Sequence, residues 1–224
     1  MSVNPVPPDR PIAFFDLDLT LLKVNSATLW VQSEYRRGMI STAQVMKAFW
    51  LLMRYRLGST SLDESILSAI LTLRGQKERD FEARVDDFYV RCVQDQIRHG
   101  AHQALQQHRD QGHLCYLMTS ASSYLSGHFA RDLDLDGICS QRFEVIDGVL
   151  TGRPLGGLCF GAGKLEHAYI LLKQSTIKLS ECFFYTDSFS DLPLLQAVGH
   201  PRVVHPDRKL SAYARQHSWQ IHTW

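Results

Sequence analysis

The stretch Ile12-Ala13-Phe14-Phe15-Asp16-Leu17-Asp18-Leu19-Thr20 decides the fold of this chain. Its first four residues are apolar and predict a buried strand, and two carboxylates follow at the end of that strand. Because residues i and i+2 of a strand project to the same side, Asp16 and Asp18 can face one reaction centre together. Two ionised acids this close repel each other unless a cation or a shared proton relieves the repulsion. A divalent metal with acid–base chemistry is the simplest purpose, and a helix cap or turn is the alternative.

The composition is that of an ordinary globular protein, and 224 residues suit one large domain or a core domain with an insert. With 24 basic and 23 acidic residues, the net charge of +1 gives no reason to expect nucleic acid or a membrane as a partner. Five scattered cysteines without a Cys-x-x-Cys pair indicate buried residues in a reducing compartment. No apolar signal segment is visible, and the apolar run at 48–53 is too short to cross a bilayer. We therefore expect a cytoplasmic protein.

Hydrophobic periodicity divides the chain into a helical block and a region where strands alternate with helices. In the block, residues 26–99, helical stripes at 45–57 and 81–92 and a capping-box pattern at 61–64 predict three or four packed helices. Beyond it, an Asp-Gly turn predicts a hairpin within 143–150, and Asp207 is the predicted cap of a last helix. Strands are predicted at 114–118, 182–185 and 202–204, and helices at 101–111, 125–131, 164–172 and 192–198. This alternation predicts an α/β fold with a parallel, Rossmann-like sheet that is covered on both faces.

The helical block follows directly after the first strand, so we interpret it as an inserted cap domain. The predicted boundaries give a core of residues 1–24 and 99–224 and a cap of residues 25–98. Open parallel sheets bind ligands beyond the carboxyl ends of their strands, which is where a lid belongs. We expect the hinges of this lid near residues 23–25 and 99–100.

Hydroxyl and lysine side chains follow two later predicted elements. Thr119 and Ser120 begin a loop that enters a helix, where a hydroxyl beside free helical N–H groups makes an anion site or an ordinary helix cap. Lys164 opens a predicted helix, so its charge opposes the helix dipole, which indicates a neighbouring anion or an exposed lysine of little effect. A nucleotide P-loop is excluded, because Leu158 stands where the first glycine belongs and Leu165 replaces the serine or threonine.

Asp187 and Asp191 lie four residues apart across a predicted strand-to-helix turn. Both carboxylates can reach one hard cation there, and Mg²⁺ favours few carboxylates together with waters and a substrate phosphate. The alternative is that Asp191 only complements the helix N-terminus. Together, the polar groups after these elements offer a nucleophile, a proton donor, an anion-binding hydroxyl, a cation and metal ligands. Phosphoryl transfer through an aspartyl-phosphate requires that set.

With these residues in place, the chain resembles the haloacid dehalogenase superfamily of phosphatases. The resemblance is nearest to subfamily IB, the phosphoserine-phosphatase-like branch, and implies its α/β core with a helical cap of the C1 type after the first motif. The motifs of the family are matched, in order, by Asp16, Asp18 and Thr20, by Thr119 with Ser120 adjacent, by Lys164, and by Asp187 and Asp191.

The resemblance also implies a role for each matched residue. Asp16 would attack phosphorus, and Asp18 would protonate the leaving alcohol and then take a proton from water. Thr119, with Ser120 adjacent, and Lys164 would bind the phosphoryl oxygens. The Mg²⁺ ion would be held by Asp16, the backbone carbonyl of Asp18, Asp187 and, directly or through water, Asp191.

Two departures from the phosphoserine phosphatase pattern leave the substrate open. Asn25 stands where that branch usually carries a glutamate, and Ser120-Ala121 stands where two glycines usually follow the hydroxyl. The segment 147–164 resembles a bacterial subgroup of which some members are assigned to histidinol phosphate. We expect a Mg²⁺-dependent phosphomonoesterase acting on a small phosphorylated metabolite. A phosphotransferase or mutase is the alternative, and a binding protein that kept the fold is less favoured.

Overall fold

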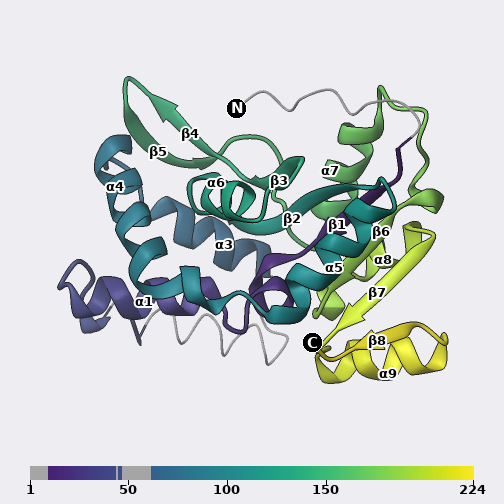
Figure 1. Cartoon of the computed structure of the whole chain (residues 1–224). Coiled ribbons are helices and arrows are strands. Elements are labelled where there is room, and N and C mark those ends of the chain that lie inside the picture. The colour runs from purple at the N-terminus through teal and green to yellow at the C-terminus, as the bar shows by residue number, and fades with distance from the viewer. Residues whose placement is uncertain (1–9, 44, 47–61) are drawn as a thin grey trace. The chain divides into compact units, whose positions relative to one another are not determined.

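The computed structural model describes residues 10–43, 45–46 and 62–224 (Figure 1). Contacts between residues divide the chain into two units. The first, here called the sheet unit, comprises Met1–Val24, Gln96–Gln141 and Gly157–Trp224. The second, here called the helical unit, comprises Asn25–Asp95 and Arg142–Gly156.

A six-stranded sheet with strand order β3-β2-β1-β6-β7-β8 forms the centre of the sheet unit (Figure 1). Every pair of neighbouring strands is parallel, and on β1 Phe14 lies opposite Tyr116 of β2 and Phe184 of β6. The apolar run of β1 is explained by its central place, because all four of its residues are buried. The strands are β1 (Ile12–Phe15), β2 (Leu114–Ser122), β3 (Gly137–Gln141), β6 (Phe183–Thr186), β7 (His200–Val204) and β8 (Gln220–His222).

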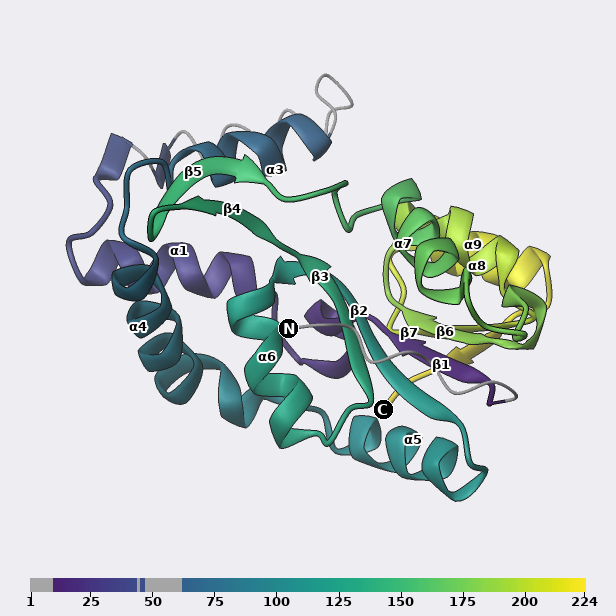
Figure 2. The same ribbon diagram turned by 90° about the horizontal axis from the view of Figure 1, so that it is seen from above.

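Helices cover both faces of this sheet (Figure 2). In that view α5 lies on one side, and α7, α8 and α9 lie on the other. On the first side, Phe15 and Tyr185 of the sheet contact His108 of α5. On the other side, Phe14 and Phe184 belong to a core cluster with residues of α7, α8 and α9. The helices of the sheet unit are α5 (His99–Asp110), α6 (Ser123–Asp132), α7 (Ala162–Leu172), α8 (Leu192–Ala197) and α9 (Arg208–Gln216).

This arrangement confirms the expected α/β fold with a parallel sheet. Asp207 caps α9 as predicted, since its side chain accepts a hydrogen bond from the Leu210 amide at 2.8 Å. Strands β3 and β8 are additions that the sequence pattern did not predict. Short helical turns also occupy Leu17–Leu21, Tyr89–Val93, Gln94–Gln96, Leu179–Glu181 and Phe189–Asp191.

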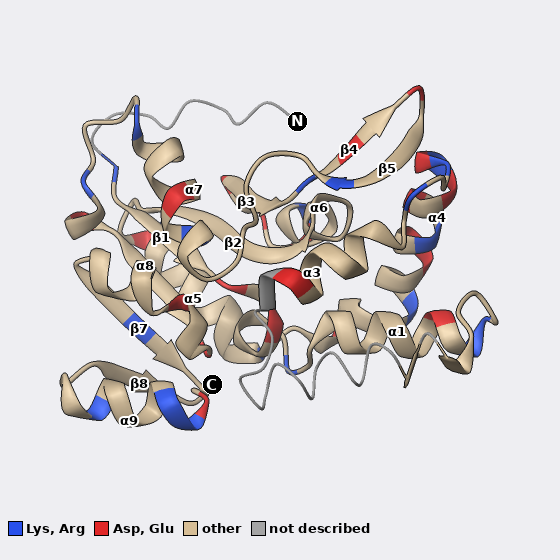
Figure 3. Cartoon of the chain, turned by 180° about the vertical axis from the view of Figure 1, so that it is seen from behind, with Lys and Arg blue, Asp and Glu red and all other residues tan. Residues whose placement is uncertain are grey.

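The helical unit combines helices α1 (Ser26–Arg36), α3 (Leu62–Leu71) and α4 (Glu78–Phe88) with the antiparallel hairpin β4 (Phe143–Ile146) and β5 (Val149–Pro154). Trp30 of α1 packs edge-on against Phe81 and Phe88 of α4. Both signs of charge alternate along the outside of α4 (Figure 3). The predicted stripe at 45–57 falls largely on residues 47–61, which lie outside the described part of the chain, as does the first residue of the predicted capping box at 61–64. The helix that this box was predicted to open, α3, begins at Leu62.

The hairpin turns at Asp147 and Gly148 as predicted, and both residues have positive φ. The predicted boundaries assign this hairpin to the core segment 99–224, and the observed contacts do not. Contacts group it with the helical unit, because the Gly75 amide donates to Leu150 O at 2.9 Å and the Leu150 amide donates to Gln76 O at 2.9 Å. The helical unit is therefore built from two separate pieces of sequence.

None of the helices in the described residues is both long enough and apolar enough to pass through a lipid bilayer.

Candidate active site

The candidate residues of the sheet unit gather at the carboxyl ends of β1, β2 and β6. Asp16 follows β1, and Asp187 follows β6, its neighbour in the sheet. Between these two strands the order of the sheet reverses, and such a switch point is where open α/β sheets bind their ligands. Thr119 lies within β2, which runs four residues beyond the predicted strand.

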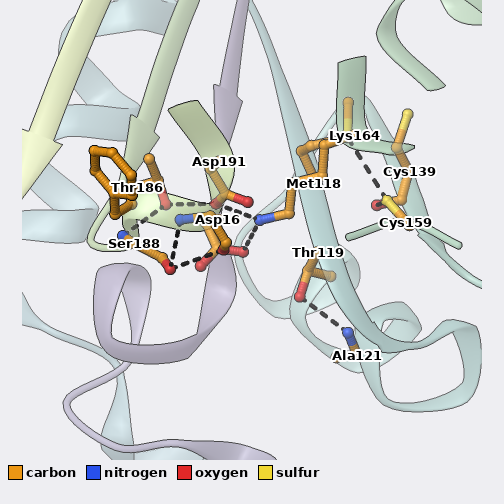
Figure 4. Close-up of polar contacts among 12 residues, drawn as sticks. Asp16, Met118, Thr119, Ala121, Cys139, Cys159, Lys164, Thr186, Ser188 and Asp191 are labelled. Atoms are coloured by element: carbon orange, nitrogen blue, oxygen red, sulfur yellow. Dashed lines mark hydrogen bonds and ion pairs between the residues drawn. The ribbon is translucent and has the colours of Figure 1, made fainter. Parts of the chain in front are cut away.

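Lys164 of α7 lies between two carboxylates (Figure 4). Its Nζ donates to Oδ1 of Asp16 at 2.7 Å and to Oδ2 of Asp191 at 2.8 Å. All three residues are buried, with exposed fractions of 2% for Lys164, 7% for Asp16 and 1% for Asp191. Lys164 is therefore not an exposed lysine of little effect, because its charge is compensated by two anions, one directly after β1 and one at the start of α8.

Burial and mutual repulsion disturb the ionisation of the acids. Burial raises the pKa of Asp16 to about 7, although the nearby Lys164 lowers it and the charges of Asp191 and Asp18 raise it. Burial also raises the pKa of Asp187 to about 8, and the charge of Asp16 contributes to this rise. For Lys164, burial alone would lower the pKa, but Asp16 and Asp191 reverse that effect and raise it. The site thus holds a firmly charged lysine and two acids that resist ionisation in the absence of another cation.

Asp191 is held by a residue that the sequence reasoning did not select. Thr186 Oγ1 donates to Oδ2 of Asp191 at 2.6 Å, and the Ser188 amide donates to the same hydroxyl at 3.2 Å. Asp191 stands at the N-cap position of α8 and makes no capping hydrogen bond with its side chain. Its carboxylate accepts from Lys164 and Thr186 instead, so it does more than complement the helix N-terminus. The signal for Thr186 is a hydroxyl at the buried end of an otherwise apolar strand, immediately before Asp187.

The hydroxyl motif is not a helix cap either. The cap of α6 is Ser122, whose side chain accepts from the Leu125 amide at 3.3 Å. Thr119 is 1% exposed, and its hydroxyl accepts from the Ala121 amide at 3.1 Å. Ser120 is partly exposed next to it. Their role as phosphate ligands remains a prediction.

Asp18 lies in the wide turn Leu17–Leu21 that follows β1. Its backbone is extended, with φ −67° and ψ 131°, whereas the next residue, Leu19, has the left-handed φ of 59°. The charge of Asp18 acts on the pKa of Asp16, so the two acids of the first motif lie close together. Asp16 makes no capping hydrogen bond at this turn, which removes the cap alternative for that residue.

A divalent cation fits the donors of this site, although its ligand set is a prediction. Within the described residues, no three side chains of His, Cys, Asp or Glu form a cluster that could enclose a metal ion by themselves. Mg²⁺ commonly takes only one or two carboxylates and completes its shell with other oxygens and water. Oδ1 of Asp191 is buried without a hydrogen-bond partner. The pKa values of Asp16 and Asp187 are both raised, because the positive charge around these carboxylates does not compensate the cost of their burial. A buried, unpaired carboxylate oxygen together with two acids of raised pKa suits a hard divalent cation that binds oxygen ligands.

Comparison with known proteins places this geometry in a family. Phosphoserine phosphatase SerB1 of Mycobacterium tuberculosis is 28% identical over 213 residues, covering 93% of this chain and 69% of the relative. Histidinol-phosphatase of Neisseria meningitidis is 23% identical, covering 95% of this chain and 98% of the relative. A solved structure from Bordetella pertussis Tohama I, of a protein of unknown function, has a TM-score of 0.86 at 27% identity over 95% of this chain and 97% of its own. The model of the haloacid dehalogenase-like hydrolases matches residues 13–196, so the chain belongs to that family.

Proposed function

We propose that this protein is a Mg²⁺-dependent phosphomonoesterase that hydrolyses a small phosphorylated metabolite through an aspartyl-phosphate on Asp16. The observation that carries the proposal is the buried contact of Lys164 with Asp16 and Asp191 at the switch point of the sheet. Relatives named for phosphoserine and for histidinol phosphate make these two compounds the first candidate substrates.

In the first step, a carboxylate oxygen of Asp16 forms a bond to phosphorus while the bond from phosphorus to the substrate oxygen breaks. Asp18 donates its proton to that departing oxygen, so the product leaves as a neutral alcohol. In the second step, water attacks phosphorus, Asp18 takes the proton of the water, and the carboxylate of Asp16 is released. The position of Asp18 in the turn directly after β1, where its charge acts on Asp16, supports this role.

Lys164 lowers the pKa of Asp16 against the effect of burial and offsets the repulsion between this carboxylate and a phosphate dianion. Its ammonium is held from the other side by Asp191, which Thr186 orients in turn. Thr119 and Ser120 are the proposed hydroxyl ligands of the transferring phosphoryl oxygens. Fixed dipoles and charges of this kind stabilise charge that moves in the transition state without reorganising.

Asp16, the backbone carbonyl of Asp18, Asp187 and Asp191 would hold Mg²⁺, which supplies positive charge beside the phosphoryl group when bound. The raised pKa values of Asp16 and Asp187 support this assignment, since both acids need a second cation to ionise fully at neutral pH.

The helical unit is the proposed cap that selects the substrate. The chain passes between the units at 24–25, 95–96, 141–142 and 156–157, and the first two of these points flank the helices. Residues just outside those two points are tied together, because the Lys23 amide donates to Gln96 O at 2.9 Å and the Arg98 amide donates to Leu21 O at 2.8 Å. We therefore place the second hinge near 95–96 and not near 99–100. Protease protection of that segment on adding Mg²⁺ and a phosphate mimic would test the closure.

The deciding experiment measures phosphate release from a panel of phosphorylated metabolites, with Mg²⁺ and with EDTA. We expect release from one compound, dependent on Mg²⁺ and abolished in Asp16→Asn but not in Asp110→Asn, an exposed acid of α5. Release that appears only when an acceptor alcohol is present would assign a phosphotransferase instead. Binding of a phosphorylated compound without turnover would contradict the enzymatic proposal.

A further inference from the structure

The wide turn Leu17–Leu21, which carries Asp18, cannot satisfy its own backbone. Leu19 has a left-handed φ of 59°, which an L-residue with a side chain adopts only when its surroundings hold it there. The turn is closed by a hydrogen bond from the Leu22 amide to Leu17 O at 2.9 Å. Leu17, Thr20 and Leu21 of this turn are buried, so their backbone carbonyl groups outside that bond need other donors.

Two residues from distant parts of the sheet unit supply those donors to four consecutive carbonyls. Arg98 donates from Nη2 to Leu19 O at 3.4 Å, from its amide to Leu21 O at 2.8 Å, and from Nε to Leu22 O at 3.1 Å. The remaining carbonyl, that of Thr20, accepts from Nε1 of Trp224 at 3.3 Å. The whole carbonyl edge of the turn after Asp18 is thus held by Arg98 and Trp224.

Trp224 is itself fixed on several sides. Its ring stacks on Tyr185 of β6 at 5.5 Å, and Tyr185 stacks on Phe15 of β1 at 4.6 Å, so three rings form one column. Its carbonyl accepts from Nη1 of Arg98 at 3.3 Å and contacts Nε2 of His205 at 2.6 Å. In Figure 2 the yellow ribbon that ends at the mark C runs toward β1 and α5.

The start of α5 is shaped to receive this tryptophan. A Cβ atom added to Gly100 would lie 2.0 Å from Cβ of Trp224, so only glycine leaves room for the contact. The same helix begins directly after Arg98, which brings the arginine and the tryptophan to the turn together. Through these contacts, Trp224 after β8 is fixed to the turn Leu17–Leu21.

We infer that Arg98 and Trp224 are positioning residues that hold Asp18 at the leaving group. The inference rests on the proposed function, in which Asp18 protonates the departing oxygen. A general acid must lie within hydrogen-bond distance of the atom it protonates, and a small displacement of the acid lowers the rate steeply. Neither residue contacts the reacting atoms in this account, since both act through the backbone of the turn.

The test uses Trp224→Phe, which keeps an aromatic ring beside Tyr185 but removes the donor to Thr20 O. The matched control is Trp219→Phe, which makes the same chemical change at a ring packed on Tyr213 and His217 of the α9 region. A second variant, Arg98→Lys, keeps the positive charge but has one nitrogen in place of the three that donate to Leu22 O, Trp224 O and Leu19 O.

The decisive readout is how kcat/KM depends on the leaving group. An alkyl phosphate needs the proton of Asp18, whereas 4-nitrophenyl phosphate has a stable leaving anion and does not. In Trp224→Phe and Arg98→Lys we expect kcat/KM to fall about tenfold for the alkyl phosphate and to stay within about twofold for the nitrophenyl ester. A merely structural role would lower kcat/KM by the same factor for both substrates, and that result would overturn the inference. The inference would also be overturned if Trp224→Phe and Trp219→Phe changed kcat/KM for the two substrates in the same way.

Amide hydrogen exchange at residues 19–23 separates this inference from the proposed function. Faster exchange there in Trp224→Phe than in Trp219→Phe supports the attachment, and equal exchange contradicts it, whether or not phosphate is released. If the wild-type protein releases no phosphate from any compound, the proposed function fails, and the exchange result alone then decides whether Trp224 holds the turn.

Discussion

Replacing Asp187 by asparagine should stabilise the metal-free protein at pH 8. Burial and the charge of Asp16 raise the pKa of Asp187 to about 8 in the folded state, against 3.8 for an ordinary aspartate. The contribution of Asp187 to stability is therefore fully present below pH 4 and is lost as the pH rises toward 8. Each pH unit in that window lowers the free energy of unfolding by up to about 1.4 kcal/mol.

The size of the gain follows from this window. Four pH units set an upper limit of about 5 kcal/mol at pH 8 and of about 1.5 kcal/mol at pH 5. Asp187 interacts with the charges of Asp16 and Lys164, so part of the unfavourable energy of its ionisation is shared with those groups and is not recovered by the substitution. We therefore expect the free energy of unfolding to rise by about 2 to 4 kcal/mol at pH 8. Urea unfolding in EDTA at both pH values measures it.

Asp191→Asn is the matched control, because it makes the same chemical change four residues away and should change the free energy of unfolding in the opposite direction. The Asp191 carboxylate accepts from Lys164 and Thr186, so its loss should lower the free energy of unfolding by about 3 kcal/mol. Mg²⁺ at a hundred times its Kd should add about 2.7 kcal/mol to the wild type at pH 8, and much less to Asp187→Asn. A destabilised Asp187→Asn protein, or a gain that is the same at pH 5 and pH 8, would refute the reasoning.

Three other substitutions test the buried polar groups of the sheet unit by urea unfolding. Lys164→Met leaves Asp16 and Asp191 without their cation, so the free energy of unfolding should fall by about 3 to 5 kcal/mol at pH 8 and by less at pH 5, where protons can replace the charge. Thr186→Val removes one donor to Asp191 and should cost about 1 to 2 kcal/mol, with phosphate release reduced but not abolished. Burial lowers the pKa of His108 to about 4, so its stabilising contribution is present above pH 6.5 and is lost, by up to about 3 kcal/mol, as the pH falls toward 4. His108→Phe should flatten that part of the profile, and an unchanged acid limb would contradict this account.

Local signals in the sequence predicted the parts of the fold that depend on neighbouring residues. The four apolar residues of β1, the Asp147-Gly148 turn with both φ angles positive, and the Asp207 cap are confirmed because each needs only its own few residues. Strands β3 and β8 escaped prediction because they are short and mixed in character, and they become strands by pairing with β2 and β7.

The individual residues of the polar site were predictable from local patterns, whereas their contacts with partners far away in the sequence were not. Asp16, Lys164 and Asp191 were selected from strand ends and do meet in space. Their ion pairs join residues up to 148 positions apart, and the bond from Trp224 to Thr20 joins residues 204 positions apart. No local pattern contains such contacts, so Trp224 and Arg98 became visible only in three dimensions.

The two-piece construction of the helical unit has a consequence for synthesis and for engineering. Its hairpin emerges from the ribosome only after residues 96–141, which belong to the sheet unit, so α3 waits for its partner strand while the first half of the sheet is made. An exchange of caps between relatives that transfers only residues 25–95 would leave Gly75 and Gln76 facing a hairpin from the wrong parent. A chimera that keeps the helical unit intact must therefore carry residues 142–156 along, so under the proposed function this short hairpin travels with the cap that selects the substrate.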